Sequence, residues 1–169
     1  KKSKNSKNLR NVEKKVLDSE NWFGCLYYEI IQEKKNGKQY YTLLGWDGID
    51  EYSTQKIIDV LHFTRNKITF GHPIFIKEKN KDNRVLIEYD ERTSVSLSYN
   101  KKEKKIIFNN LIPIKKELEG LYEYYVPDGS NNSYNYKSGK WIFEKDIDAR
   151  NDKNNNSRKK PKMGLLPSR

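Results

Sequence analysis

The fold class is decided by residues 22–46, WFGCLYYEIIQEKKNGKQYYTLLGW. Aromatic and β-branched residues dominate both ends of this stretch, and such residues are typical of strands. Between the two ends lies Asn36-Gly37, and both residues accept the positive φ angles of a type I′ turn. The stretch therefore predicts a β-hairpin with its turn at residues 35–38.

Outward from this hairpin, short apolar runs alternate with turn-forming residues. For residues 55–63 a strand is favoured over a helix through Ile57, and Pro73 within 68–76 predicts an edge strand or a bulge. We expect residues 127–133 to be a turn cluster and residues 134–143 to form a hairpin across 137–140. Further strands are predicted over 84–90, 94–100, 105–110 and 121–126.

The clearest pattern lies in residues 84–110, where three short runs are separated by polar turns. Residues 94–99 alternate strictly, so Val95, Leu97 and Tyr99 are predicted to face a core. We interpret the three runs as one meander. Together the runs predict a mostly β fold, a single antiparallel meander that forms a sandwich or a barrel-like sheet, with extended basic tails.

The net charge of +11 lies at the two ends of the chain. Residues 1–15 carry seven basic and one acidic side chain, and residues 145–169 carry eight and three. Of the 34 basic and 23 acidic residues in the whole chain, residues 16–144 therefore hold 19 of each. We predict a neutral β domain at 21–149 between a basic N-terminal tail or tether at 1–20 and a basic C-terminal tail at 150–169.

The chain length of 169 residues suits one domain. Cys25, the single cysteine, lies among apolar residues and is predicted to be a buried thiol. No run approaches the roughly 18 apolar residues of a membrane-spanning helix. The chain begins Lys1-Lys2-Ser3, as we expect of a processed product or of a fragment whose signal region is not in this sequence.

No residue pattern identifies an enzyme, a cofactor site or a metal site. His62 and His72 lack metal-motif spacing, and no G-x-S-x-G elbow is present. Residues 146–152 have the composition of a calcium loop but lack its glycine at loop position six and its closing glutamate. We therefore predict no catalytic, cofactor-binding or metal-binding residues.

The loop carboxylates, Asp47 and Asp50 in one group and Glu88, Asp90 and Glu91 in another, are expected to be solvated turn residues. A pair about 5 to 9 Å apart beside aromatic rings would instead suit glycoside chemistry. The candidate ligand or partner surface combines such carboxylates with rings, and its members are Trp46, Asp47, Glu88, Asp128, Tyr134 and Trp141.

Several segments together resemble an uncharacterised family of exported cell-envelope proteins of Bacteroidota. They are residues 40–48, 56–61, 70–75, 84–89, 139–141 and 146–151, and the resemblance covers about residues 22–151. It implies a periplasmic or outer-membrane-associated location and carries no catalytic residues.

Three functions fit these observations. The first is a non-catalytic accessory or scaffold subunit of an envelope assembly, with a protein partner docked on the β domain. The second is a glycan-binding or glycan-cleaving module that uses Trp46 and Trp141 with Asp47 or Glu88. The third is nucleic-acid binding through the basic tails, which could also contact another acidic surface or a glycan.

Overall fold

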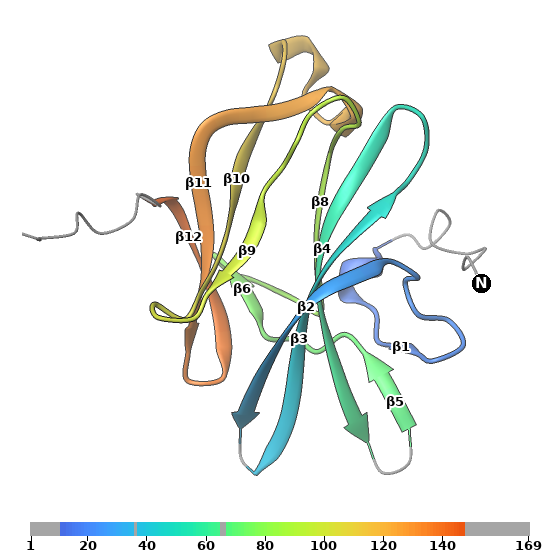
Figure 1. Ribbon diagram of the computed structural model, residues 1–169, viewed down its shortest axis with the longest axis vertical. Helices are drawn as coiled ribbons and strands as arrows, with labels where there is room; N and C mark the ends of the chain where they lie inside the picture. Colours follow the sequence, from blue (N-terminus) through green and yellow to red (C-terminus); the bar gives the residue numbers. More distant parts are fainter. Residues whose placement is uncertain (1–10, 36, 65–66, 148–169) are drawn as a thin grey trace, which may run out of the picture.

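Two six-stranded β-sheets pack against each other in the computed structural model, which describes residues 11–35, 37–64 and 67–147 (Figure 1). The first sheet contains β1 (Leu17–Asp18), β2 (Leu26–Lys35), β3 (Lys38–Gly48), β4 (Ser53–Thr64), β5 (Lys67–Phe70) and β8 (Val85–Asp90). The second contains β6 (Phe75–Lys77), β7 (Asn80–Asp82), β9 (Leu97–Asn100), β10 (Lys105–Pro113), β11 (Tyr125–Lys137) and β12 (Lys140–Ile147). The fold is mostly β and sandwich-like, as predicted, and no closed barrel forms.

The hairpin predicted from residues 22–46 is present. β2 and β3 pair antiparallel up to Lys35 opposite Lys38, and Gly37 has a φ of 77°. β4 covers the whole of residues 55–63, so the helical alternative there is wrong. The last hairpin is also confirmed, with Lys137 of β11 opposite Lys140 of β12.

The three runs in residues 84–110 do not form one meander. β8 pairs with β4 in the first sheet, whereas β9 and β10 pair with each other in the second. Val95 and Leu97 are buried as predicted. Alternation shows which face of a strand is buried, but it does not show which neighbour the strand takes.

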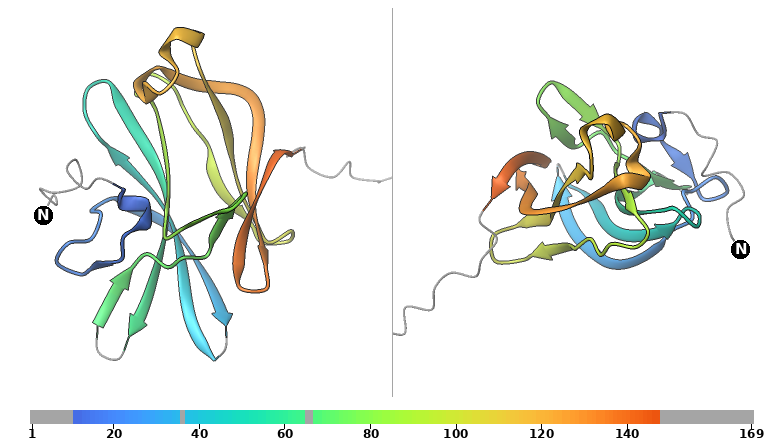
Figure 2. Two further views of the ribbon diagram at one scale, coloured as in Figure 1. Left: turned by 180° about the vertical axis from the view of Figure 1, so that it is seen from behind. Right: turned by 90° about the horizontal axis from the view of Figure 1, so that it is seen from above.

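The chain changes sheets after β5, forms β6 and β7 in the second sheet, and returns to the first sheet as β8 (Figure 2). β6 runs parallel to β12, whereas the other strand pairs among the described residues are antiparallel. Pro73 lies in the connection before β6, so the prediction of an edge strand or bulge at this residue is wrong. Proline has no backbone N–H, but outside a strand no ladder hydrogen bond is lost at this position.

Residues 121–133 differ most from expectation. Two 3₁₀ helices, η3 (Lys116–Leu118) and η4 (Tyr122–Tyr124), precede β11, which then continues through the predicted turn cluster at 127–133. A register shift between Asn131 and Ser133 and the φ of 91° at Gly129 place the turn-forming residues in an irregular strand.

The space between the sheets is filled by large rings and aliphatic side chains. Trp141 of β12 has no exposed surface, and its indole Nε1–H donates a hydrogen bond of 3.0 Å to Oγ1 of Thr42 in β3. Tyr134 of β11 is also buried in this core. These two rings were predicted to lie on a ligand or partner surface, but both contribute to the core because their strand faces point toward the first sheet.

Residues 11–25, which we call the N-terminal layer, cover the outer face of the first sheet, the face that points away from the second sheet. The layer includes the 3₁₀ helix η2 (Val12–Lys14) and β1, and it buries Val12, Leu17, Phe23 and Cys25 against Ile57. Residues 11–20 therefore belong to the folded unit and not to the tail assigned to 1–20. The remaining predicted tail residues, 1–10 and 150–169, lie outside the described residues.

A buried ion pair joins this layer to the sheet. Arg84 Nε donates to Asp59 Oδ2 at 3.2 Å, and Arg84 Nη1 donates to the carbonyl oxygens of Val12 and Lys15. Tyr27 also donates its hydroxyl to Asp59 Oδ2. Burial raises the pKa of Asp59 even though Arg84 acts in the opposite direction. Both charged side chains lack exposed surface, so their mutual pairing is what makes their burial tolerable.

Candidate binding surfaces

A groove of about 360 Å³ crosses the edge of β8. Four consecutive β8 residues, Val85 to Glu88, line it. Since successive strand residues point to opposite faces of a sheet, lining by all four means that the edge of the strand itself borders the groove. Among the described pairings, β8 has a ladder partner only in β4, so no strand pairs with its second edge, which we call the bare edge, although η4 and β11 approach it.

The inner end of the groove, between the sheets, is aromatic. The Tyr134 ring lies 5.9 Å from that of Phe108 and 5.5 Å from that of Phe143, measured between centroids. Lys77 Nζ lies 4.8 Å from the centre of the Phe143 ring. Burial raises the pKa of Tyr134, so its hydroxyl stays protonated. The inner end can therefore receive an apolar group.

A chain of amides borders this aromatic end. Asn132 donates from Nδ2 to Asn110 Oδ1, and Asn110 donates from Nδ2 to Asp128 Oδ2, each at 2.8 Å. The backbone N–H of Ser130 also donates to Asp128, and these bonds lower the pKa of that carboxyl. Asp128 therefore fixes the groove wall through Asn110.

The outer end of the groove is acidic. Glu88 of β8 and Glu13 of the N-terminal layer both line it, and within the described part of the chain neither carboxylate takes part in an ion pair. Gln55 lies opposite Glu88 in the β4–β8 register and donates from Nε2 to Asp47 Oδ2 at 3.3 Å. The outer end thus suits a cationic group.

The structure brings together part of the predicted surface. Glu88 and Tyr134 both line the groove, and Asp128 and Asp47 each hydrogen-bond a residue that lines it. Trp46 is exposed on β3 and does not line the groove, and Trp141 lies in the core. Sequence reasoning missed the bare edge of β8. The pair Asn109-Asn110, which interrupts an apolar run, hinted only at the polar wall of the groove on β10.

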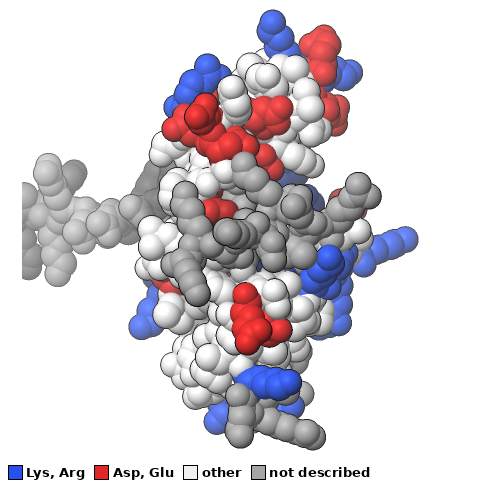
Figure 3. Space-filling model, turned by 90° about the vertical axis from the view of Figure 1, so that its right-hand side faces the viewer, with Lys and Arg blue, Asp and Glu red and all other residues white. Residues whose placement is uncertain are grey.

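The other singled-out carboxylates stabilise turns. Asp50 accepts hydrogen bonds from the backbone N–H groups of Tyr52 and Ser53, and Asp90 accepts them from the backbone N–H and the guanidinium of Arg92. They lie in a hollow of about 740 Å³ together with Glu51, Glu91 and Glu123, at the end of the molecule formed by the β3–β4 turn and η4. Figure 3 shows acidic side chains gathered at the upper end of the molecule, interspersed with basic ones.

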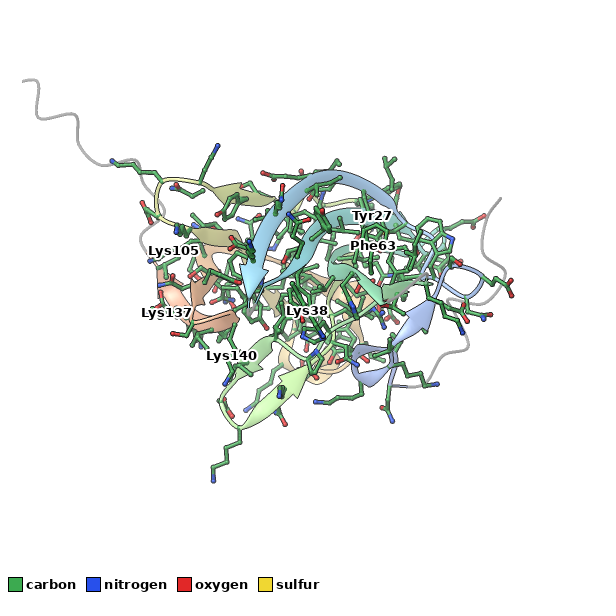
Figure 4. All side chains as sticks on the ribbon, turned by 90° about the horizontal axis from the view of Figure 1, so that it is seen from below. Tyr27, Lys38, Phe63, Lys105, Lys137 and Lys140 are labelled. Atoms are coloured by element: carbon green, nitrogen blue, oxygen red, sulfur yellow. The ribbon has the colours of Figure 1, made fainter. Side chains whose placement is uncertain are left out.

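The outer face of the first sheet is bare beyond the N-terminal layer. There Ile30 of β2, Phe63 of β4 and Ile68 of β5 are 67%, 58% and 40% exposed. Phe63 lies opposite Ile68, and its ring centroid is 6.2 Å from that of Tyr41 in β3. We call these four residues the apolar face. Figure 4 shows Phe63 on the same side as Tyr27 and away from Lys105, Lys137 and Lys140 of the second sheet.

The surroundings of the apolar face are neutral or basic. Exposed Lys34 lies on this face at the adjoining hairpin end, whereas Lys38 and Lys67 at the hairpin ends alternate to the other face. The strand register places Gln32 and Gln39 on the same face, and beyond Leu43 the described residues of this face include no acidic side chain. A partner with an acidic rim would therefore meet favourable charge.

The histidines and the cysteine behave as structural residues. The rings of His62 and His72 lie 5.2 Å apart and pack against Tyr40. Cys25 is buried, as predicted, and burial raises the pKa of its thiol to about 12. In residues 11–35, 37–64 and 67–147 no group of three or more His, Cys, Asp and Glu side chains could hold a metal ion. Most of the calcium-loop segment, from Asp148 onward, lies outside the described residues.

Comparison of the chain with models of protein families, with curated proteins and with solved structures found no match. No helix among the described residues has the length and apolar character that crossing a membrane requires.

Proposed function

We propose that the protein is a non-catalytic accessory or scaffold subunit of a bacterial envelope assembly, and that the apolar face docks a protein partner. The exposure of Ile30, Phe63 and Ile68 on an uncovered sheet face carries this proposal. Contiguous apolar side chains at a protein surface mark interaction sites. On the same sheet face, the N-terminal layer already buries Val12 and Leu17.

The partner surface that fits is apolar at its centre and acidic at its rim. Lys34 beside the apolar face would attract such a rim. A second copy of this chain would bring another Lys34 and no acidic rim to the interface, which disfavours self-association through this face.

The periplasmic or outer-membrane-associated location is supported by the family resemblance of residues 22–151. Fractionation of the source cells with antibodies against the protein tests this part separately. Recovery in the cytoplasmic fraction would contradict the location and leave the docking surface to its own test.

Docking is tested by co-purification from detergent extracts of the source cells at two salt concentrations. Wild type is compared with Ile30→Thr/Phe63→Thr and with a control, Tyr52→Thr/Ile112→Thr, whose two residues are exposed elsewhere. Threonine keeps the strand preference while removing most of the apolar surface. We expect one set of partners that the first variant loses, the control keeps and high salt weakens.

Two results would contradict this function. One is recovery of the same proteins with both variants, and the other is a monomer without partners in every extract. Sedimentation of the purified protein at several concentrations distinguishes self-association from a separate partner.

Nucleic-acid binding through the tails stays a prediction, since the tails lie outside the described residues. A deletion that tests it should end at residue 10, because Val12 and Lys15 accept hydrogen bonds from Arg84 and contribute to the fold. Unchanged affinity for DNA or RNA after removal of residues 1–10 and 152–169 would contradict tail binding.

A further inference from the structure

The bare edge of β8 lacks several of the sequence features that usually protect an edge strand, although η4 packs against one end of it. Its sequence, Val-Leu-Ile-Glu-Tyr-Asp, contains no lysine or proline, and its pairing with β4 has no bulge. The opposite edge of the first sheet, at β2, is different. There the Tyr28 hydroxyl donates to the Leu97 carbonyl and the Tyr99 N–H donates to Glu29, so β9 lies against that edge.

The groove reaches both faces of the first sheet around this edge. Leu86 and Glu88 lie opposite Ile57 and Gln55 of β4, on the outer face. Val85 and Ile87 lie on the inner face, toward the aromatic end with Tyr134 and Phe108. A strand placed beside β8 would direct its side chains alternately to these same two sides.

We infer that the groove receives an extended segment of a partner polypeptide, which adds to the first sheet as a strand beside β8. Main-chain hydrogen bonds to the bare edge supply affinity, and the two ends of the groove select side chains. This inference rests on the proposed function only in requiring a protein partner, and it uses a surface separate from the apolar face.

The lining defines the segment that fits. Side chains on the inner side meet the partly exposed Phe143, Val85 and Leu111 and are therefore apolar. Those on the outer side meet the Glu88 and Glu13 carboxylates and are therefore basic. η4 packs against the C-terminal end of β8, where Tyr122 also lines the groove. The open part, Val85 to Glu88, accommodates about four residues, or roughly 13 Å of strand.

The same lining disfavours an oligosaccharide. Sugars stack on open aromatic faces, but Phe108 and Tyr134 are only 6% and 3% exposed. The Nδ2 groups of Asn132 and Asn110 already donate within the wall. The main-chain edge, by contrast, offers donors and acceptors at the repeat of a polypeptide.

Synthetic peptides test the inference by fluorescence anisotropy with the full chain. The probe is labelled Thr-Val-Lys-Val-Lys-Val-Thr, and its counterpart carries glutamate in place of lysine. Two further versions of the lysine peptide are N-methylated, one at every valine and one at every lysine. In a strand only alternate N–H groups face the neighbour, so methylation at one set should abolish binding and methylation at the other should spare it.

Charge reversal on the protein tests the outer end. Glu88→Lys should weaken the lysine peptide by about tenfold or more and favour the glutamate peptide, because the carboxylate contacts the outward side chains. Glu117→Lys changes the net charge equally at an exposed position in η3 and should leave both affinities within about twofold. The Ile30→Thr/Phe63→Thr variant should bind the peptide with the affinity of the wild type. The peptide test therefore stays valid even if the apolar face turns out not to dock a partner.

Four outcomes would overturn the inference. They are no binding at about millimolar peptide, equal effects of the two methylation patterns, no response to Glu88→Lys, and displacement of the peptide by maltohexaose. An increase in affinity after removal of residues 1–10 and 152–169 would assign the groove to the basic ends of this chain instead of a partner.

Discussion

Replacement of Arg84 by methionine removes the only cation that pairs with Asp59 among the described residues. Methionine fills much of the arginine volume, so the main effect is electrostatic. Asp59 is left buried, with Tyr27 and the Val60 N–H as its hydrogen-bond donors. The carbonyl oxygens of Val12 and Lys15 lose the Nη1 donor at the same time.

The expected loss in the free energy of unfolding is large for the replacement of a single side chain. Breaking a buried ion pair by removing one partner costs about 3 to 5 kcal/mol, because a charge stays buried without compensation. For a domain of this size each kcal/mol lowers the Tm by roughly 4 °C, which gives a fall of about 12 to 20 °C. The N-terminal layer should loosen first, since its carbonyl contacts to Arg84 disappear.

Two measurements check this prediction, thermal unfolding followed by tryptophan fluorescence and the rate at which a thiol reagent labels Cys25 under native conditions. Cys25 is the single cysteine and is buried where the N-terminal layer packs on the first sheet, so labelling reports opening of that layer. Arg92→Met is the matched control, since Arg92 pairs with Asp90 at 2.6 Å but is exposed, and we expect it to resemble wild type. An Arg84→Met variant as stable as Arg92→Met, with unchanged labelling of Cys25, would refute the reasoning.

Three further predictions concern single sites. Thr42→Val leaves the Trp141 indole N–H without its acceptor and should cost about 1 to 3 kcal/mol in urea unfolding, and a cost near zero would show that the bond is unimportant. Gly71→Ala should destabilise the fold by more than about 1 kcal/mol and speed labelling of Cys25. The reason is that φ at Gly71 is +95° and the added Cβ would lie 2.8 Å from the Lys15 carbonyl oxygen. Unchanged Tm and labelling would contradict this prediction. Burial lowers the pKa of His62 below its unfolded value near 6.5, so the unfolded state binds the proton more tightly and stability should decline as the pH falls below about 6.5. His62→Gln should reduce that decline in Tm between pH 8 and pH 5, and an identical pH profile would exclude His62 as its source.

The candidate binding surfaces were only partly predictable. Glu88 and Tyr134 were singled out as a carboxylate and a ring near turns, and they meet in the groove. Trp141 was chosen for the same reason but lies in the core. Alternation along a strand separates its two faces but does not show which face another sheet will cover. The bare edge of β8 arises from the return of the chain to the first sheet after β7, and no local residue pattern encodes that return.

The sequence by itself determined the mostly β fold class, the Asn36-Gly37 and Ser138-Gly139 hairpins, the burial of Val95, Leu97 and Cys25, and the position of the charge excess. These features depend on backbone preference and on side-chain alternation over a few residues. The tertiary structure alone decided that β8 pairs with β4, that residues 11–20 pack on the sheet, and that Arg84 and Asp59 meet inside. Such contacts join residues far apart in the chain. Their free energy depends on how completely the rest of the fold buries the contacting groups away from water.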